Sequence, residues 1–291
     1  MRTRRRAAIL AASAAAFAVA FIAFPGSAGA VVPNCTPPTT PTNDSCAKGL
    51  ISPSTGLDGT FHNVKLFVRT RTNFEDPGNT AAGGEASKVT LDFDNDGTIN
   101  VGTLPTCSEA AVAGKTIQQA WNTCGPGAGA SKNAYLSTEV APTGFGCTVN
   151  PCVSGQARAA PAINACTLVF NGPKNASGQP TTTLFARAPI PPSGTGQSCN
   201  DNPSTLTSGT STVVLKGTVS TSPLAGYGKR LTVPNIDTKS PLPLIDFYAY
   251  VKRGNFFVSK CTASPLKLRA NWVYSGTGQT PDTFVSSQAC S

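Results

Sequence analysis

Three aspartates at alternate positions, followed by a glycine, have the order that opens a calcium-binding loop: Asp92, Asp94, Asp96 and Gly97. In such a loop the alternate carboxylates converge on the ion, and the glycine permits a sharp turn. The twelfth position carries threonine here, where a calcium loop carries a bidentate glutamate. Aspartate, asparagine and glycine also favour a turn between two β-strands. We expect a β-hairpin turn and no cofactor, with a weak structural calcium site as the alternative.

His62 is the only histidine, so any catalytic triad that uses an imidazole must include it. The alternation of side chains along its strand places it on the same face as Val64 and Leu66. We therefore expect a half-buried, hydrogen-bonded core residue at this position. Neither G-x-S-x-G nor H-E-x-x-H occurs in the chain, and no catalytic residue is assigned.

A pair of carboxylates can hydrolyse a glycosidic bond without histidine. Several acidic residues lie in segments that read as loops or as the start of a helix: Glu75, Asp76, Glu85, Glu109 and Glu139. The sequence does not place any two of them across a cleft. An extracellular glycoside hydrolase with a carboxylate pair is therefore the alternative function, and no pair is named.

Basic residues are concentrated at the C-terminal end of the chain. Residues 31–228 contain eleven basic and eleven acidic residues, whereas residues 229–291 contain eight basic and three acidic ones. Neighbouring strands near the C-terminus could gather basic and aromatic side chains on one outward face, which would bind an anionic cell-envelope polysaccharide through ion pairs and ring stacking. An ordinary solvated face is the alternative. The candidate binding residues are Tyr248, Tyr250, Lys252, Lys267 and Arg269.

We expect no nucleic-acid partner, because the basic residues are too few for a strong phosphate-binding surface. Export also separates the protein from nucleic acid. Residues 1–30 have the order of a secretory signal peptide: a basic start, an apolar stretch over 7–24, and small residues that end at Ala30. We expect cleavage after Ala30, with an uncleaved anchor as the alternative. No transmembrane segment is expected after cleavage, so the protein would be secreted or loosely associated with the cell envelope.

Ten cysteines, an even number, predict a disulfide framework in an exported chain. A zinc site is disfavoured, because no C-x-x-C motif occurs and only one histidine is present. Spacing alone does not determine connectivity. We predict that neighbours pair: Cys35 with Cys46, Cys107 with Cys124, Cys147 with Cys152, Cys166 with Cys199, and Cys261 with Cys290.

The mature chain begins with an arm rich in proline and threonine over residues 31–56, and a folded domain over 57–291 follows. Within the domain, apolar residues alternate with polar ones in many short runs, which is typical of β-strands with one buried face. We predict an all-β, antiparallel, disulfide-stapled sandwich of the immunoglobulin-like or jelly-roll-like kind. Turns are predicted at Asp96-Gly97 and Asn171-Gly172. Residues 188–209 are expected to form a surface excursion or a seam between two half-domains.

One segment has helical spacing instead, near residues 108–122. Ser108 is the expected N-cap, and Gly114 weakens the helix. A disulfide between Cys107 and Cys124 would hold this short helix at both ends and press Trp121 against a sheet.

Three short motifs resemble a group of secreted, uncharacterised actinobacterial proteins: Leu-Pro-Thr-Cys at 104–107, Cys-Gly-Pro at 124–126 running into 127–130, and Tyr-Gly-x-x-Leu-x-Val-Pro at 227–234. In that group the first motif follows a strand, and a helix leads to the second cysteine. A later cysteine precedes a strand that carries tryptophan, and Cys261 and Trp272 fit this order. The resemblance covers most of the mature chain. It implies secretion and topology, and it implies no activity.

Two functions follow from these observations. The first is a non-catalytic secreted β-sandwich that is associated with the cell envelope or the extracellular matrix and binds anionic glycans. The alternative is the glycoside hydrolase.

Overall fold

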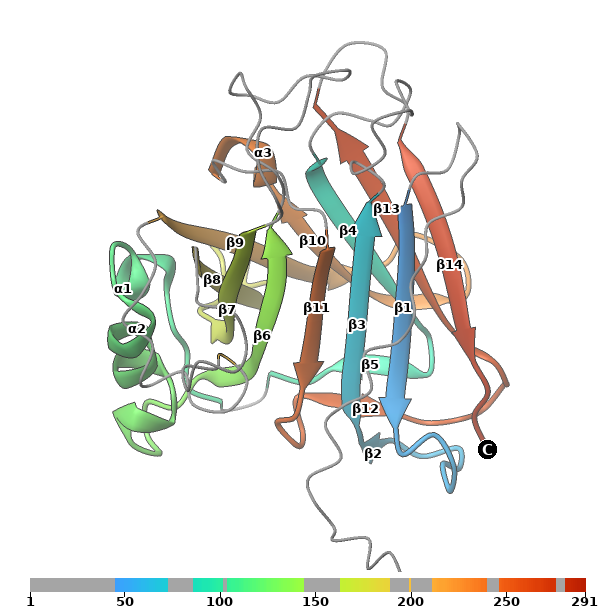
Figure 1. Cartoon of the computed structure of the whole chain (residues 1–291). Helices are drawn as coiled ribbons and strands as arrows, with labels where there is room; N and C mark the ends of the chain where they lie inside the picture. The colour runs from blue at the N-terminus through green and yellow to red at the C-terminus, as the bar shows by residue number, and fades with distance from the viewer. Residues whose placement is uncertain are drawn as a thin grey trace, which may run out of the picture. The chain divides into compact units, whose positions relative to one another are not determined.

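The structure is a computed structural model, and all the residues that it describes belong to one compact unit, Val32–Ser291 (Figure 1). The described residues are 45–72, 86–101, 104–143, 163–188, 199, 211–239, 246–275 and 281–291. The predicted signal peptide lies outside them, as do most of the predicted arm and nearly all of the 188–209 segment.

Eight strands form a large sheet in the order β14-β13-β4-β10-β9-β8-β7-β6. Each strand is antiparallel to its neighbours. In chain order the strands are β4 (Ala86–Asp94), β6 (Tyr135–Thr143), β7 (Ile163–Gly172), β8 (Thr181–Ala188), β9 (Ser211–Thr221), β10 (Tyr227–Pro234), β13 (Leu266–Tyr274) and β14 (Asp282–Gln288).

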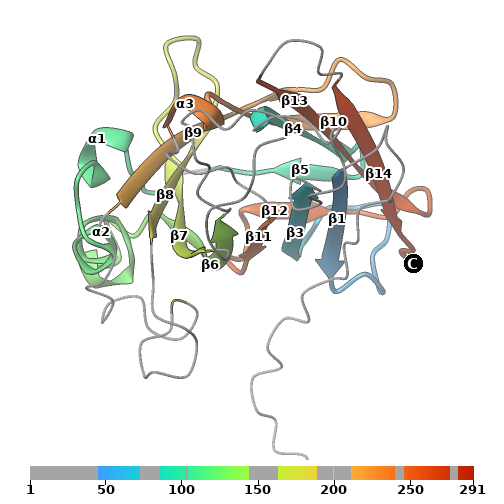
Figure 2. The same cartoon turned by 45° about the horizontal axis from the view of Figure 1, so that its top comes forward.

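A three-stranded antiparallel sheet, β1-β3-β11, faces the large sheet (Figure 2). A second small sheet, β2-β12-β5, closes one end of the space between them. The predicted antiparallel all-β sandwich is therefore confirmed. The strands of the two small sheets are β1 (Ser45–Ser52), β3 (Lys65–Thr72) and β11 (Asp246–Val251), then β2 (His62–Asn63), β5 (Gly97–Ile99) and β12 (Phe257–Ser259).

One hydrophobic core lies between the facing sides of these sheets. The apolar alternation predicted in the sequence directs its side chains there, and Ala270 and Trp272 of β13 are almost completely buried. Leu66 and Val68 of β3 belong to the same core, as does Phe93 of β4. The hydrophobic effect of burying these alternating residues holds the two sheets face to face.

Side-chain hydrogen bonds also join the edge strands of the large sheet to those of the three-stranded sheet, β6 to β11 and β14 to β1. Ser137 Oγ on β6 donates a hydrogen bond of 2.7 Å to Tyr250 O on β11 and accepts one of 3.0 Å from Tyr250 N. On the opposite side, Gln288 Oε1 on β14 accepts a bond of 2.7 Å from Ile51 N on β1, and Gln288 Nε2 donates one of 3.1 Å to Ile51 O. Side chains thus satisfy backbone groups that an edge strand would otherwise present to another chain.

Two short helices, α1 (Glu109–Val112) and α2 (Ile117–Cys124), replace the single helix that the sequence predicts in this region. Ser108 is the N-cap as expected, because its side chain accepts a bond from the backbone of the first turn. The helix breaks after one turn because Gly114 adopts φ +69°, outside the right-handed helical region. Thr116 then starts a new helix with a capping box.

The Cys107–Cys124 disulfide joins the start of this helical pair to its end, as predicted. Trp121 packs edge-on against Tyr135, with ring centroids 5.0 Å apart, at the start of β6. The helices cover the side of β7 and β8 that points away from the main core. The buried residues of this second cluster include Val112, Ile117, Leu168, Phe170 and Phe185.

Three of the predicted disulfides are confirmed: Cys107–Cys124, Cys166–Cys199 and Cys261–Cys290. Cys46 is also disulfide-bonded, and its partner lies outside the described residues. No cysteine among the described residues is free. The pairing of Cys35 with Cys46 and the pairing of Cys147 with Cys152 remain predictions.

The boundary predicted at residue 57 falls after the first strand of the fold. The strand β1 lies inside the predicted arm, yet it pairs with β3 along its whole length and buries Ala47 and Ile51. The low apolar content of residues 31–56 does not indicate a strand, because only alternate positions of a half-buried strand need apolar residues.

The predicted turn at Asn171-Gly172 is also displaced. Both residues lie in β7, and residues 173–180 connect β7 to β8. The buried Asn171 side chain instead donates hydrogen bonds to the carbonyls of Leu104 and Pro105. Asn171 therefore binds the backbone of a segment that is distant in sequence, and it does not form a turn.

The strand β1 approaches β13 closely at Gly49. A Cβ atom at this position would lie 2.8 Å from Leu268 Cδ2 and 2.9 Å from Leu268 Cβ. Gly49 N also donates a bond of 3.2 Å to Ser286 Oγ on β14. Glycine is needed here because a larger residue would separate the two sheets at this edge.

We expect Gly49→Ala to lower the free energy of unfolding by about 1–3 kcal/mol, because the new methyl group overpacks the core against Leu268. Gly59→Ala is the matched control: a Cβ atom added there would meet nothing within 4 Å beyond its chain neighbours, and we expect a change below about 0.5 kcal/mol. Urea denaturation of the oxidised proteins measures both. Equal stability of the two variants would contradict the close approach of β1 to β13.

Candidate binding face

The outward side of the large sheet consists of two parts. The helices α1 and α2 cover it on β7 and β8 with apolar contacts. On β14, β13, β4, β10 and the adjoining part of β9, the outward positions are mostly polar or charged. We call this second part the arginine face; its cross-strand neighbours include Lys88, Thr90, Asp92, Thr218, Ser220, Arg230, Thr232, Lys267, Arg269, Asn271 and Thr283.

A carboxylate held by two arginines lies at the centre of the arginine face. Arg230 binds Asp92 through two bonds, Nε to Oδ1 at 2.6 Å and Nη2 to Oδ2 at 3.0 Å. Arg269 Nη1 donates a third bond of 3.2 Å to Oδ2, and Ser222 Oγ donates a fourth of 2.7 Å to Oδ1. This arrangement joins β4 to both of its neighbouring strands through charge-assisted hydrogen bonds.

The three charged side chains differ in exposure. The side chain of Asp92 has no exposed area, whereas those of Arg230 and Arg269 are 22% and 24% exposed. Burial by itself would raise the pKa of Asp92. The hydrogen bonds from Arg230 and Ser222 outweigh that cost and hold the pKa below its ordinary value. Asp92 is therefore a bound carboxylate at neutral pH.

The two guanidinium groups share a single carboxylate, so one positive charge remains uncompensated within this cluster. Arg230 and Arg269 have more N–H donors than Asp92 can accept. Two exposed lysines, Lys88 and Lys267, add to the positive charge, and Asp94 near the rim reduces it. The face as a whole is basic in charge and rich in hydrogen-bond donors.

A row of hydroxyl and amide groups runs beside this cluster from strand to strand. The register aligns Thr283, Asn271, Thr90, Thr232 and Thr218 on five neighbouring strands. Asn271 Nδ2 donates a bond of 2.9 Å to Thr283 Oγ1. Because neighbouring strands are about 4.8 Å apart, the row presents polar groups at a regular spacing.

The five predicted binding residues do not lie on one face. Lys267 and Arg269 are on the arginine face, but Tyr250 and Lys252 belong to β11 and the residue after it, in the three-stranded sheet. Tyr248 is also on β11, and its side chain is outside the described residues. The prediction of one shared face is wrong because β11 pairs with β3, whereas β13 pairs with β14 and β4.

Sequence reasoning missed Arg230 and Ser222. Both lie more than 100 residues after Asp92 in the chain, and only the pairing of β10 with β4 brings Arg230 opposite Asp92. The alternation of residues 227–234 does contain a signal, because it places Arg230 and Thr232 on the side opposite Leu231 and Val233.

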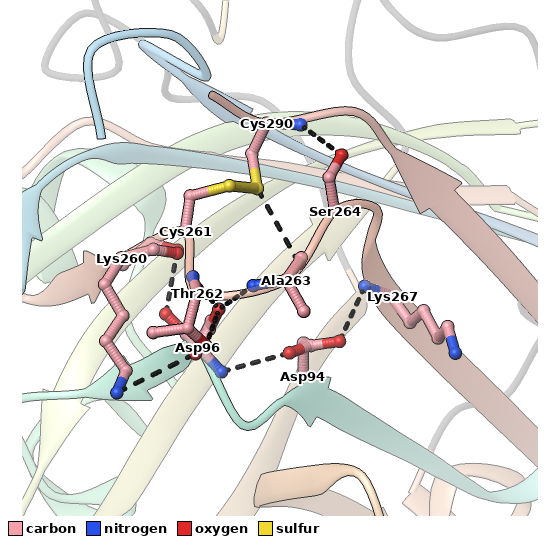
Figure 3. Close-up of a disulfide and its surroundings, with 10 residues drawn as sticks. Asp94, Asp96, Lys260, Cys261, Thr262, Ala263, Ser264, Lys267 and Cys290 are labelled. Carbon is pink, nitrogen blue, oxygen red and sulfur yellow. Dashed lines mark hydrogen bonds and ion pairs between the residues drawn. A yellow bond between two sulfur atoms is a disulfide. The ribbon is translucent and has the colours of Figure 1, made fainter. Parts of the chain in front are cut away.

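The three candidate calcium ligands have separate roles. Asp92 binds the arginines. Asp94 Oδ1 accepts a bond of 3.0 Å from Asp96 N, and its Oδ2 accepts one of 3.1 Å from Lys267 N on β13 (Figure 3). The predicted turn exists, but the predicted hairpin does not, because β5 leaves β4 and pairs with β12.

Asp96 binds the segment that carries a disulfide (Figure 3). Its carboxylate accepts bonds from Thr262 N and Oγ1 and from Ala263 N, and Lys260 Nζ lies 3.8 Å away. Burial would raise the pKa of Asp96, but the bonds from Thr262 and Ala263 lower it overall. Cys261, within the same segment, is joined to Cys290.

The calcium hypothesis therefore lacks a converging set of ligands. Among the described residues, no group of three histidine, cysteine, aspartate or glutamate side chains is placed to hold a metal ion. The carboxylates of the 92–96 segment instead connect β4 and its turn to three later parts of the chain.

His62 is half-buried and hydrogen-bonded as expected, but it does not belong to the hydrophobic core. Its Nε2 lies 2.8 Å from Asp58 Oδ1 and 3.3 Å from Thr60 Oγ1, and the two side chains of the His62–Asp58 pair are 40% and 67% exposed. Bonds from Thr60 and His62 hold the pKa of Asp58 well below its usual range. The core position was wrongly predicted because β2 has only two residues and pairs with β12, separately from β3.

Asp92, Asp96 and Glu109 do not resemble the acid and base of a glycoside hydrolase. Such an enzyme needs a carboxylic acid with a raised pKa. Asp92 and Asp96 have lowered pKa values, and Glu109 forms an ion pair of 2.8 Å with Lys239 on α3 (Ile236–Lys239). The other candidate acids, or their side chains, lie outside the described residues: Glu75, Asp76, Glu85 and Glu139.

A small pocket lies between the sheets near Gly49 and Leu268. Its volume is about 40 Å³, and its lining also includes Phe93, Asp94 and Gln288. Binding pockets for small molecules usually have volumes of about 300–1,000 Å³. This pocket is too small for a sugar ring.

Comparisons with protein-family models, with curated proteins and with solved structures give no match for this chain. No helix within the described ranges is long and apolar enough to cross a membrane.

We expect Asp92→Ala to lower the free energy of unfolding by about 3–5 kcal/mol at pH 7, because it leaves two partly buried arginines without their carboxylate. Asp237→Asn on the half-exposed helix α3 is the control, with an expected change below about 0.5 kcal/mol. Urea denaturation is the measurement.

The pH dependence provides a second measurement. Since the pKa of Asp92 is lowered by folding, its contribution is present above the unfolded pKa of about 3.9 and is lost as the pH falls through the folded pKa. The stability difference between wild type and Asp92→Asn should therefore shrink below about pH 4. A difference that stays constant down to pH 2 would contradict the ion-paired carboxylate.

Proposed function

We propose that this protein is a non-catalytic, secreted β-sandwich of the cell envelope or the extracellular matrix, and that it binds anionic glycans through the arginine face. The observation that carries the proposal is the central cluster, in which Arg230 and Arg269 share the single carboxylate of Asp92. The remaining guanidinium donors and the unbalanced positive charge favour an anionic partner.

A glycan fits the chemistry of the rest of this face. Arginine and lysine bind carboxylate, sulfate and phosphate groups, and arginine does so with two parallel hydrogen bonds. The row that includes Thr283, Asn271 and Thr232 supplies hydroxyl and amide groups that can bond sugar hydroxyls. A sheet surface with charged and neutral donors side by side suits a polymer that carries both kinds of group.

Secretion is supported by the disulfides. Cys107–Cys124, Cys166–Cys199 and Cys261–Cys290 are bonds of a kind that persists in oxidising compartments and is rare in the cytosol. The predicted signal peptide over residues 1–30 agrees with this location.

The test compares a double variant of the arginine face with a matched control. Lys88→Gln with Lys267→Gln removes two exposed positive charges and leaves the Asp92 cluster intact. Lys132→Gln with Lys174→Gln removes two exposed charges elsewhere. We expect the first variant to bind immobilised polygalacturonate at least about tenfold more weakly than wild type, which corresponds to about 1.4 kcal/mol, and the second to bind within about twofold of it.

Two further controls define the interaction. Binding of the wild type should weaken as salt rises, because the screening length falls from about 30 Å at 0.01 M to about 10 Å at 0.1 M. Neutral dextran should not retain the protein. Equal binding by the two double variants, or retention on dextran that salt does not affect, would refute the proposal. Unchanged melting temperatures would show that the substitutions leave the fold intact.

A further inference from the structure

The outward side of the three-stranded sheet carries a second set of basic residues. The register places Lys48 on β1 opposite Arg69 on β3, and Lys65 starts β3. Lys252 follows β11, and its Nζ lies 5.1 Å from the centroid of the Tyr250 ring, on the same side of the sheet. We call this surface the lysine face, after its two exposed lysines, Lys65 and Lys252.

An apolar row crosses the lysine face between its charges. The register aligns Leu50, Phe67 and Tyr250 on β1, β3 and β11, and the rings of Phe67 and Tyr250 have centroids 6.0 Å apart. Phe67 is buried, whereas Leu50 and Tyr250 are half-buried, so Tyr250 carries the aromatic ring of this row that a ligand could reach. An aromatic ring beside cationic side chains can contact the apolar side of a sugar while the cations bind its anionic groups.

At the described outward positions of β1, β3 and β11 there is one acidic residue, Asp246, which by register lies opposite Arg71. Arg69 and Arg71 lie on the same side, and each has an interaction partner. The positive charge on which the second site depends is therefore that of Lys48, Lys65 and Lys252. It has the same sign as the charge of the arginine face.

The two basic faces point in opposite directions. Leu66 and Val68 of β3 and Leu268 and Ala270 of β13 point inward and meet in one core. Positions next to them in each strand point outward, since side chains alternate. Two packed sheets are about 10 Å apart, so the core separates a polymer on one face from a polymer on the other.

We infer that this protein is bivalent for anionic polysaccharide and that it bridges two polymer chains, one on each face. The inference rests on the proposed function of the arginine face and adds the lysine face as an independent second site. Lys65 and Lys252 supply the exposed charge for the second site. Once one face has bound a polymer chain, the other face is held close to the neighbouring chains of a dense matrix. The second binding event then takes place at a high effective concentration, so the protein is retained more strongly than either face alone would retain it.

Two measurements test bivalency on the full oxidised protein. Calorimetric titration with a short galacturonate oligosaccharide should give two bound molecules per protein. Light scattering of dilute long-chain polygalacturonate should rise as protein is added and fall again in excess protein, when every face holds a separate chain. A single-site protein would give one bound oligosaccharide and no rise in scattering.

Matched variants separate the two faces. Lys88→Gln with Lys267→Gln weakens the arginine face, and Lys65→Gln with Lys252→Gln weakens the lysine face by the same change of charge. Each double variant should retain one oligosaccharide with nearly wild-type affinity and, as a single-site protein, should give no rise in scattering. The four-fold variant should lose both sites, while Lys132→Gln with Lys174→Gln should behave as wild type.

The outcomes distinguish this inference from the proposed function. If the arginine-face variant loses all binding and the lysine-face variant loses none, bivalency is wrong and the proposed function stands. If the wild type binds no oligosaccharide at all, both are wrong. Retention of two sites in the lysine-face variant would overturn the assignment of the second site to Lys65 and Lys252.

Discussion

The architecture depends on the closure of both pairs of sheet edges by side chains. Ser137 satisfies the backbone of β11 from β6, and Gln288 satisfies the backbone of β1 from β14. Without these contacts, β11 at Tyr250 and β1 at Ile51 would present unpaired N–H and C=O groups, which invite pairing with other chains. The closed edges also fix the two sheets relative to each other within this unit. Each outward face can then present its charges on a rigid support.

The ion pairs of Asp92 affect both the stability of the fold and the charge of the arginine face. A buried ion pair contributes little more to stability than well-packed apolar residues would, since the desolvation of its charges opposes their attraction. Here the cost is limited, because only the carboxylate is fully buried and both arginines reach solvent. An apolar replacement would preserve packing and remove the positive charge. The cluster is thus better explained by the surface that it creates than by stability alone.

The sequence predicts the class of this fold well and its site only in part. Alternation along residues 64–68, 89–93 and 266–274 identifies buried strand faces, because the period of two is a local property. The helix stop at Gly114 and the cap at Ser108 are also local. Strand order is not local: nothing near Arg269 indicates that Asp92 will lie opposite it, or that β11 belongs to another sheet. The partners of Asp92 and the separation of the two basic faces therefore require the structure.

The side-chain bonds that join β1 to β14 have a consequence for how the chain reaches its native state. The bonds between Ile51 and Gln288 join residues 237 positions apart. Contacts of such long sequence separation form slowly, because the entropy of closing a long loop is lost before the contacts compensate for it. Until β1 and β14 meet, a partly folded chain exposes an incomplete sheet, and such species aggregate readily. The protein should therefore benefit from chaperones that hold it until the final strand is in place.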